Sequence, residues 1–223
     1  MAWKSIYYHG RVRKEGGNVV KKLFEDWRRF LTEDKDKYII LLPGGYKPPH
    51  KGHLQMIRKY AEHPDVEKVF VFVGSAPRQS NDGTMSFDVD KTIKVFELYG
   101  VLNDPKVELL RSSSRISSKG KEYENPFADA IDFVKDADPA LFQGKIFALG
   151  HSSKDADRGE KFAKITKDYN NAETDVPPIT VNADEISATN LRNAIADGNK
   201  EEVEKALPLP AMYDDFMRIV VSS

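Results

Sequence analysis

Short apolar runs that alternate with segments of helical spacing constrain the fold of this chain most strongly. Each run is bounded by turn-forming residues, and the five runs lie at 38–42 (YIILL), 68–73 (KVFVFV), 107–110 (VELL), 145–149 (KIFAL) and 179–181 (ITV). Strands that are apolar throughout are typical of a parallel sheet, because helices cover both faces of such a sheet. The pattern therefore predicts an α/β fold, with a parallel sheet of about five strands and helices on both faces.

Helical spacing fills the intervals between the predicted strands. The expected helices lie at 54–61, 88–99, 126–134, 154–169 and 186–195, and C-terminal helices complete the domain. Polar segments that are rich in turn formers are predicted to be surface loops, at 75–86, 111–125 and 171–178. A sheet of this kind binds ligands at the carboxyl ends of its strands, so the site is expected at that edge.

The N-terminal part differs in character, and we predict a helical extension at 1–37 followed by one domain at 38–223. Six apolar side chains would share one face of an amphipathic helix in this extension: Val20, Leu23, Phe24, Trp27, Phe30 and Leu31. Two interpretations are open, because an apolar stripe is costly to leave in water. The helix packs onto the sheet domain, or it docks onto a partner or a second copy of the chain.

Composition excludes several classes of protein. The formal net charge is −1, whereas a protein that wraps a nucleic-acid backbone usually presents a strongly basic face. The chain has no cysteine, which excludes disulfides and thiolate metal sites. No apolar run approaches the ~18 residues of a membrane span, and the first residues lack the apolar region of a secretory signal. We expect a soluble, cytoplasmic protein that binds neither nucleic acid nor a membrane.

The segment PGGYKPPHKGHLQMI follows the first predicted strand. Gly44 and Gly45 let the backbone pass close to a ligand. His50 and His53 lie three residues apart at the expected start of a helix, so both rings can face the same point. Gly52 removes a Cβ that would otherwise meet a bulky group such as a phosphate chain. The first turn of a helix also offers free N–H groups and the positive end of the helix dipole, which favour an anion.

A second helix start, in the segment ISATNLRNAI, has similar chemistry. Ser187 is a good N-cap, Thr189 lies in the first turn, and the side chain of Arg192 leans back toward the helix start. Hydroxyls, free N–H groups and a guanidinium would converge on one point, which suits a polyphosphate. Either segment alone is compatible with an ordinary surface turn, but the two together indicate a phosphate site.

The pair HxGH (here HKGH) and ISxTxxR (here ISATNLR) resembles the cytidylyltransferase-like superfamily of nucleotidyltransferases over roughly residues 38–200. Members include nicotinamide mononucleotide adenylyltransferase, phosphopantetheine adenylyltransferase and glycerol-3-phosphate cytidylyltransferase. The resemblance implies a Rossmann-like fold and an enzyme in which a phosphorylated or nucleotide-like acceptor attacks the α-phosphate of a nucleoside triphosphate and releases pyrophosphate. It also implies Mg²⁺ that accompanies the nucleotide, often without a dedicated set of protein ligands.

This resemblance gives the candidate residues their roles. It implies that the catalytic residues are His50, His53 and Arg192, with the histidines on the triphosphate and Arg192, Ser187 and Thr189 on its β- and γ-phosphates. Further nucleotide-binding residues implied by position are Gly44, Gly45, Tyr46, Lys47, Gly52, Gly150, His151, Asp155 and Ile186. The acceptor-binding residues implied are Gly74, Ser75 and Arg78. Charged loop residues at the same sheet edge are candidates for a phosphate clamp: Arg115, Lys119 and Lys121, together with Arg78.

Departures from the family's patterns bear on the substrate. The segment NADEISATNLR lacks the Arg-Thr of the RTEGISTT-like segment of glycerol phosphate cytidylyltransferases, which favours transfer of AMP over CMP. The segment GGYKPPHKGH resembles the GRFQPPHxGH form of one branch of nicotinamide mononucleotide adenylyltransferases. However, Tyr46 and Lys47 replace its Phe and Gln, and a glycine replaces its Arg. Nicotinamide mononucleotide is therefore one candidate acceptor, and the acceptor stays open.

Two alternative functions also stay open: a cytidylyltransferase that acts on a phosphorylated alcohol or sugar, and a non-catalytic nucleotide-binding or assembly module. A class I aminoacyl-tRNA synthetase carries an HIGH motif, but it also needs a KMSKS-like loop and an anticodon-reading domain, which do not fit this length and charge. A P-loop NTPase is excluded, because the motif GxxxxGK[ST] does not occur.

Overall fold

The computed structural model describes residues 37–116, 120, 122–137, 145–151, 156–168 and 187–221. The chain divides into two compact units, Met1–Lys35 and Asp36–Ser223, and all described residues belong to the second. Two predicted elements lie outside the described residues, namely the amphipathic helix at 20–31 and the strand at 179–181.

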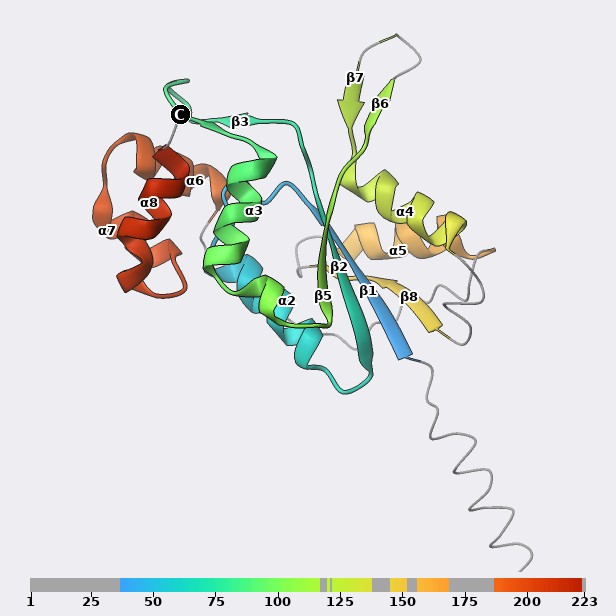
Figure 1. Cartoon of the computed structure of the whole chain (residues 1–223). Helices are drawn as coiled ribbons and strands as arrows, with labels where there is room; N and C mark the ends of the chain where they lie inside the picture. Colours follow the sequence, from blue (N-terminus) through green and yellow to red (C-terminus); the bar gives the residue numbers. More distant parts are fainter. Residues whose placement is uncertain are drawn as a thin grey trace, which may run out of the picture. The chain divides into compact units, whose positions relative to one another are not determined.

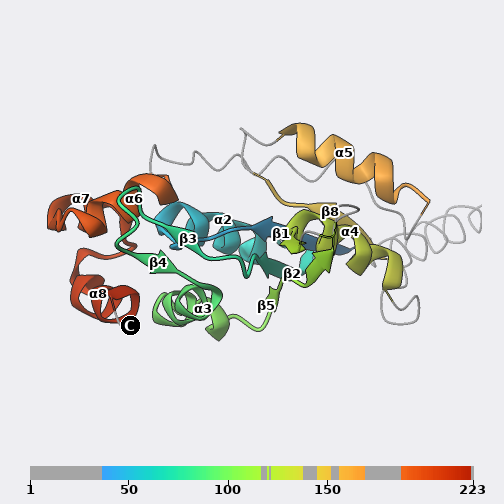
Figure 2. The ribbon, with the colours of Figure 1, turned by 90° about the horizontal axis from the view of Figure 1, so that it is seen from above.

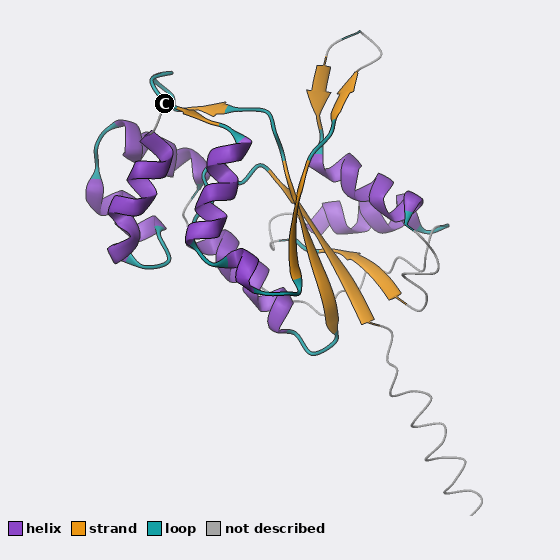
Figure 3. Ribbon diagram, viewed as in Figure 1, coloured by secondary structure: helices purple, strands orange, loops and turns teal. Residues whose placement is uncertain are grey.

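A parallel sheet forms the centre of this unit (Figure 3). Its strands follow the order β5-β2-β1-β8 and have the bounds β1 (Lys37–Gly44), β2 (Val66–Val73), β5 (Val107–Arg111) and β8 (Lys145–Leu149). All three neighbouring pairs are parallel. The predicted Rossmann-like α/β fold is confirmed, and four of the five predicted strands are observed.

Helices cover both faces of the sheet (Figures 1 and 2). One face carries α2 (Lys51–Glu62) and α3 (Val89–Leu98), followed along the chain by the 3₁₀ helix Val101–Asn103. The other face carries α4 (Pro126–Asp136) and α5 (Ala156–Thr166). The C-terminal elements lie beside α2 and α3: α6 (Ala188–Ala196), α7 (Lys200–Ala206), the 3₁₀ helix Pro210–Met212 and α8 (Tyr213–Val221).

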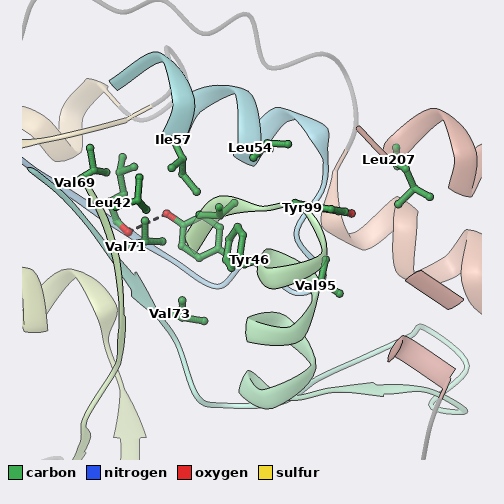
Figure 4. Close-up of a cluster of buried hydrophobic side chains, with 14 of the residues drawn as sticks. Leu42, Tyr46, Leu54, Ile57, Val69, Val71, Val73, Val95, Tyr99 and Leu207 are labelled. Atoms are coloured by element: carbon green, nitrogen blue, oxygen red, sulfur yellow. Dashed lines mark hydrogen bonds between the residues drawn. The ribbon is translucent and has the colours of Figure 1, made fainter. Parts of the chain in front are cut away.

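Successive strand residues enter two separate hydrophobic cores. Ile40 and Leu42 of β1 belong to the core under α2, α3 and the C-terminal helices (Figure 4). Ile39 and Leu41 belong to the core under α4 and α5. This alternation follows from the two-residue period of a strand. It explains why every residue of the central run is apolar, as a sheet covered on both faces requires.

Two predicted loops contain short antiparallel strands, which corrects the prediction for residues 75–86 and 111–125. β3 (Arg78–Gln79) pairs with β4 (Ser86–Phe87), and β6 (Ser114–Ile116) pairs with β7 (Glu122–Glu124). In the first hairpin Asp82 accepts hydrogen bonds from Ser80 Oγ and from the backbone N–H and hydroxyl of Thr84. This side-chain network closes the turn, and strands of two or three residues are too short to show a periodic pattern.

The strand order places a topological switch point between β1 and β8. The chain moves outward from β1 to β2 and β5, and then returns to the opposite side of β1 to form β8. In open α/β sheets the crevice outside the carboxyl ends of such strands is the usual ligand site. Within the part of the chain that the structure describes, every helix is too short or too polar to cross a bilayer.

Candidate active site

The loop after β1 is shaped by the buried side chain of Tyr46. Tyr46 has a left-handed backbone (φ 50°), which is uncommon for a bulky residue. Its hydroxyl donates to the carbonyl oxygen of Leu42 at 2.9 Å, and its ring is buried in the core (Figure 4). A Cβ on Gly44 would lie 2.7 Å from this ring. Gly44 is therefore required by the packing of Tyr46, whose ring faces the core and not the sheet edge.

Side chains of helix α3 and its C-cap donate hydrogen bonds to the same loop. The hydroxyl of Thr92 donates to the carbonyl oxygen of Tyr46 at 3.3 Å, and the hydroxyl of Tyr99 donates to that of Pro49 at 3.2 Å. Both side chains are buried, so these bonds are shielded from water. They fix the position at which His50 begins α2.

His50 and His53 lie against each other at the start of α2, as the spacing predicts. Their ring centroids are 3.7 Å apart with an interplanar angle of 28°. The backbone N–H of His50 donates to Nδ1 of His53 at 3.3 Å, and the edge of Tyr46 packs on His53 with a centroid distance of 4.9 Å. A Cβ on Gly52 would lie 3.2 Å from the His50 ring, so packing against this ring favours glycine at position 52 even without a ligand.

Burial keeps both imidazoles neutral at pH 7. It lowers the pKa of His50 to about 4, with a smaller contribution from the charge of Lys51. Burial also lowers the pKa of His53 well below 6.5, and His50 adds to the effect. Nδ1 of His50 is buried and has no hydrogen-bond partner among the described residues. An approaching anion would raise both pKa values, because it stabilises the charged form.

Helix α6 joins its motif to the histidine loop. Ser187 is the N-cap and accepts from the backbone N–H of Asn190 at 3.0 Å, as predicted. Arg192 donates to the hydroxyl of Thr189 at 2.9 Å and to the carbonyl oxygen of Lys47 at 2.5 Å. Its Nε also donates to the carbonyl oxygen of Gln79, at 3.0 Å. The two motifs, more than 130 residues apart in the sequence, therefore meet at one point of the structure.

A cavity of about 370 Å³ opens at the carboxyl ends of β1 and β2, and Lys47 connects it to this point; the histidines and the residues of α6 are not part of its lining. Five of the residues singled out by the sequence line it: Gly44, Gly45, Lys47, Gly74 and Arg78. No sequence motif marked the other polar and aromatic residues of the lining, which are Glu124, Asn125, Phe127, Arg158 and Lys161. One helix-start signal could have revealed part of this set, since Asn125 caps α4 and Pro126 occupies its first turn.

Several predicted residues make other contacts. The hydroxyl of Ser75 donates to the carbonyl oxygen of Ser112 at 3.0 Å. Arg115 is paired with Asp129 at 2.5 Å and with Asp132 at 2.7 Å, so its charge holds β6 to α4, and its role in a phosphate clamp stays a prediction. The remaining predicted positions Lys119, Lys121, Asp155 and Ile186 lie outside the described residues.

The segment after β8 packs closely on β1 and α2. The backbone N–H of Gly150 donates to the carbonyl oxygen of Leu41 at 2.9 Å. The backbone N–H of His151 donates to the hydroxyl of Tyr60 at 3.3 Å, and the His151 ring lies over Gly159 of α5. Gly150 and His151 thus lie at the switch point, next to the end of β1.

The cytidylyltransferase-like family profile matches residues 41–194, which include the second half of β1, the other three strands of the parallel sheet and both motifs. The chain belongs to this family. It is accordingly a nucleotidyltransferase, and the predicted family and enzyme class are confirmed.

Solved structures share the fold at low identity. A bifunctional NMN adenylyltransferase/ADP ribose pyrophosphatase from Francisella tularensis is 15% identical with a TM-score of 0.53, and the match covers 84% of this chain and 51% of that one. The present chain therefore spans about half the length of that protein. Nicotinic acid mononucleotide adenylyltransferase from Plasmodium falciparum, complexed with APC, is 15% identical with a TM-score of 0.50, and the match covers 79% and 94% of the two chains. No curated protein matches the sequence.

Proposed function

We propose that this nucleotidyltransferase moves AMP from ATP to a phosphorylated small-molecule acceptor and releases pyrophosphate. The observation that carries the proposal is the contact of Arg192 with the carbonyl oxygen of Lys47, which brings two phosphate-suited helix starts together beside the cavity. The structures with the same fold include adenylyltransferases of nicotinamide and nicotinic acid mononucleotide, which supports a mononucleotide such as nicotinamide mononucleotide as a candidate acceptor.

The residues divide between the two substrates. His50 and His53 would contact the triphosphate near the α-phosphate, where neutral imidazoles donate hydrogen bonds and can take up positive charge. Ser187, Thr189 and Arg192 would hold the β- and γ-phosphates at the start of α6, where free N–H groups favour an anion. The lining of the cavity after β2, including Gly74 and Arg78, would receive the acceptor.

The chemistry needs no general base. A phosphate oxygen of the acceptor attacks the α-phosphorus of ATP, a new P–O bond forms, and the bond from the α-phosphorus to the α–β bridging oxygen breaks. Pyrophosphate leaves with the electron pair, and the attacking oxygen is already anionic, so no proton has to be removed. Such a reaction depends on positioning and on stabilisation of the charge that the phosphates carry, which the histidines and Arg192 can supply.

A divalent cation would accompany the nucleotide. The same Francisella protein is also known in complex with AMP and a manganese ion, with 14% identity to this chain. Among the described residues, no group of three or more His, Asp or Glu side chains could hold a metal. The residues at this site therefore fit a metal whose ligands are phosphate oxygens and water, as Mg²⁺ prefers, and no side chain is assigned to it.

A pyrophosphate-release screen tests the proposal. It crosses ATP, CTP, GTP and UTP with phosphorylated acceptors such as nicotinamide mononucleotide, nicotinic acid mononucleotide, glycerol 3-phosphate and ribose 5-phosphate, with and without Mg²⁺. We expect metal-dependent release with ATP and a mononucleotide. Release with CTP and an alcohol phosphate would favour the cytidylyltransferase alternative. Nucleotide binding without release from any pair would favour a non-catalytic module.

A further inference from the structure

The side chain of Lys47 is buried at the edge of the cavity. Only 2% of this residue is exposed, and its ammonium group donates a hydrogen bond to the carbonyl oxygen of Ala76. An ammonium carries three N–H donors. Among the described residues, the Lys47 ammonium has no carboxylate within salt-bridge distance. The carboxylate of Glu124 instead accepts a hydrogen bond from the backbone N–H of Ala76 at 2.5 Å.

A buried charge without a paired counter-ion is costly. The pKa of Lys47 is lowered to about 8, mainly because of burial; Glu124 and Asp88 oppose this shift, and the positive charge of Arg78 adds to it. The cavity itself has a surplus of positive charge. Lys47, Arg78, Arg158 and Lys161 line it, against one carboxylate, that of Glu124. An anionic ligand would therefore relieve the cost of holding the Lys47 ammonium in this position.

Lys47 also connects the two sides of the site. Its main-chain carbonyl oxygen accepts from Arg192, while its side chain extends to the loop after β2 and lines the cavity. The main chain thus faces the nucleotide side of the proposed site and the side chain faces the acceptor side. A substitution that changes only the Lys47 side chain should therefore affect binding of the acceptor and leave binding of the nucleotide intact.

We propose that Lys47 is the specificity-determining residue for the acceptor, and that its ammonium group binds the phosphate of a phosphomonoester inside the cavity. This inference rests on the proposed function, and it assigns the Lys47 side chain to the acceptor where the sequence resemblance implied the nucleotide. Two anionic groups must approach each other for the reaction to occur. An ammonium on the acceptor phosphate reduces their repulsion and favours the dianion over a neutral hydroxyl compound.

The first test measures binding without any nucleotide. The folded full chain is titrated by calorimetry with ribose 5-phosphate and with ribose, which differ only by the phosphate. We expect ribose 5-phosphate to bind and ribose not to bind measurably. Equal affinity for the two probes would overturn the inference, whatever the pyrophosphate screen shows, because that screen tests the reaction independently.

The second test removes the charge. Lys47→Gln should weaken ribose 5-phosphate binding by about 10-fold or more, as expected for a charge-assisted hydrogen bond, and change ATP affinity by less than about 3-fold. Lys94→Gln on the exposed side of α3 removes the same charge and should leave both affinities unchanged. A larger loss for ATP than for ribose 5-phosphate would assign the side chain to the nucleotide and overturn the inference.

The third test uses pH and does not depend on whether Lys47→Gln folds. Ribose 5-phosphate affinity should fall between pH 7.5 and 9, because the free ammonium loses its proton in this range. The other charged groups around Lys47 are Glu124, Asp88 and Arg78. The phosphate of ribose 5-phosphate is a dianion throughout this range. Lys47→Arg keeps its charge and should give a flat profile. The same fall in Lys47→Arg as in the original chain would overturn the inference.

Discussion

The guanidinium of Arg192 donates a hydrogen bond to the carbonyl oxygen of Lys47 across 145 positions of sequence, with 2.5 Å between nitrogen and oxygen. A second donor of the same side chain binds the hydroxyl of Thr189, and Nε binds the carbonyl oxygen of Gln79. Because the guanidinium is a planar fork with five N–H donors, it can hold the histidine loop, the first hairpin and its own helix in one arrangement.

Replacing Arg192 by Lys should weaken ATP binding and leave AMP binding almost unchanged. Lysine keeps the charge but loses the fork, so the loss should be roughly 1.5 to 3 kcal/mol, the range for a charge-assisted hydrogen bond. Calorimetric titration with ATP and with AMP measures both affinities. Arg218→Lys is the matched control, because Arg218 of α8 is exposed and forms an ion pair with Asp215. A similar loss for ATP and AMP would place Arg192 on the α-phosphate or in a purely structural role.

His53→Ala should lower turnover by a factor of ~100 or more and change ATP affinity much less, because the imidazole acts where charge develops in the transition state. Steady-state kinetics with the best acceptor of the screen, together with ATP titration, separates the two effects. His63→Ala, at the C-cap of the same helix, is the histidine control. If affinity and turnover fell by the same factor, His53 would serve only ground-state binding.

The free energy of unfolding should depend on His50 below pH 6.5. The pKa of His50 is about 4 in the folded protein and about 6.5 in an unfolded chain, so between these values the unfolded state binds the extra proton. The contribution of neutral His50 to the free energy of unfolding is therefore fully present above pH 6.5 and is lost as the pH falls toward 4. His50→Gln removes it, and the variant should lose less stability than the original chain between pH 7 and pH 4.5.

Urea unfolding at these two pH values measures the difference for the original chain, for His50→Gln and for the control His63→Gln. We expect the smallest change in His50→Gln. An equal loss in all three proteins would mean that other groups cause the sensitivity to acid.

Gly150→Ala should destabilise the fold by about 1 to 3 kcal/mol, the usual cost of overpacking a core. A Cβ at this position would overlap the side chain of Leu42 and lie 2.8 Å from the ring of Tyr60. Gly45→Ala is the matched control, because a Cβ on Gly45 meets no atom within 4 Å. Urea unfolding of both variants tests the prediction, which fails if the two variants are equally stable.

The central strands β1 and β2 were predictable because most of their residues are buried on both faces of the sheet. The apolar run at 145–149 coincides with β8, and the run at 38–42 is extended to Gly44 in β1. The extension was not visible in the sequence, since Pro43 and Gly44 are poor strand formers. They pair with Phe72 and Val73 of β2, so the neighbouring strand determines where β1 ends.

The candidate site was predictable where local helix chemistry defines it and not where tertiary packing does. His50, His53, Ser187 and Arg192 occupy fixed positions at helix starts, which a sequence can show. The support from Thr92 and Tyr99 depends on how α3 packs, and the contribution of α4 and α5 to the cavity depends on the sheet topology. The burial of Lys47 likewise results from the whole fold. A lysine in a proline-rich segment is normally predicted to be exposed.

The strand β1 has a consequence for how such a site can change over time. Its alternate residues belong to two different cores, and its end continues into the loop that carries Lys47 and His50 and leads into α2. A small shift of packing on either face of the sheet is thus transmitted to the same short loop, because close-packed interiors transmit strain. Preference for a new acceptor can therefore arise from substitutions deep inside the protein, at positions that never touch a substrate.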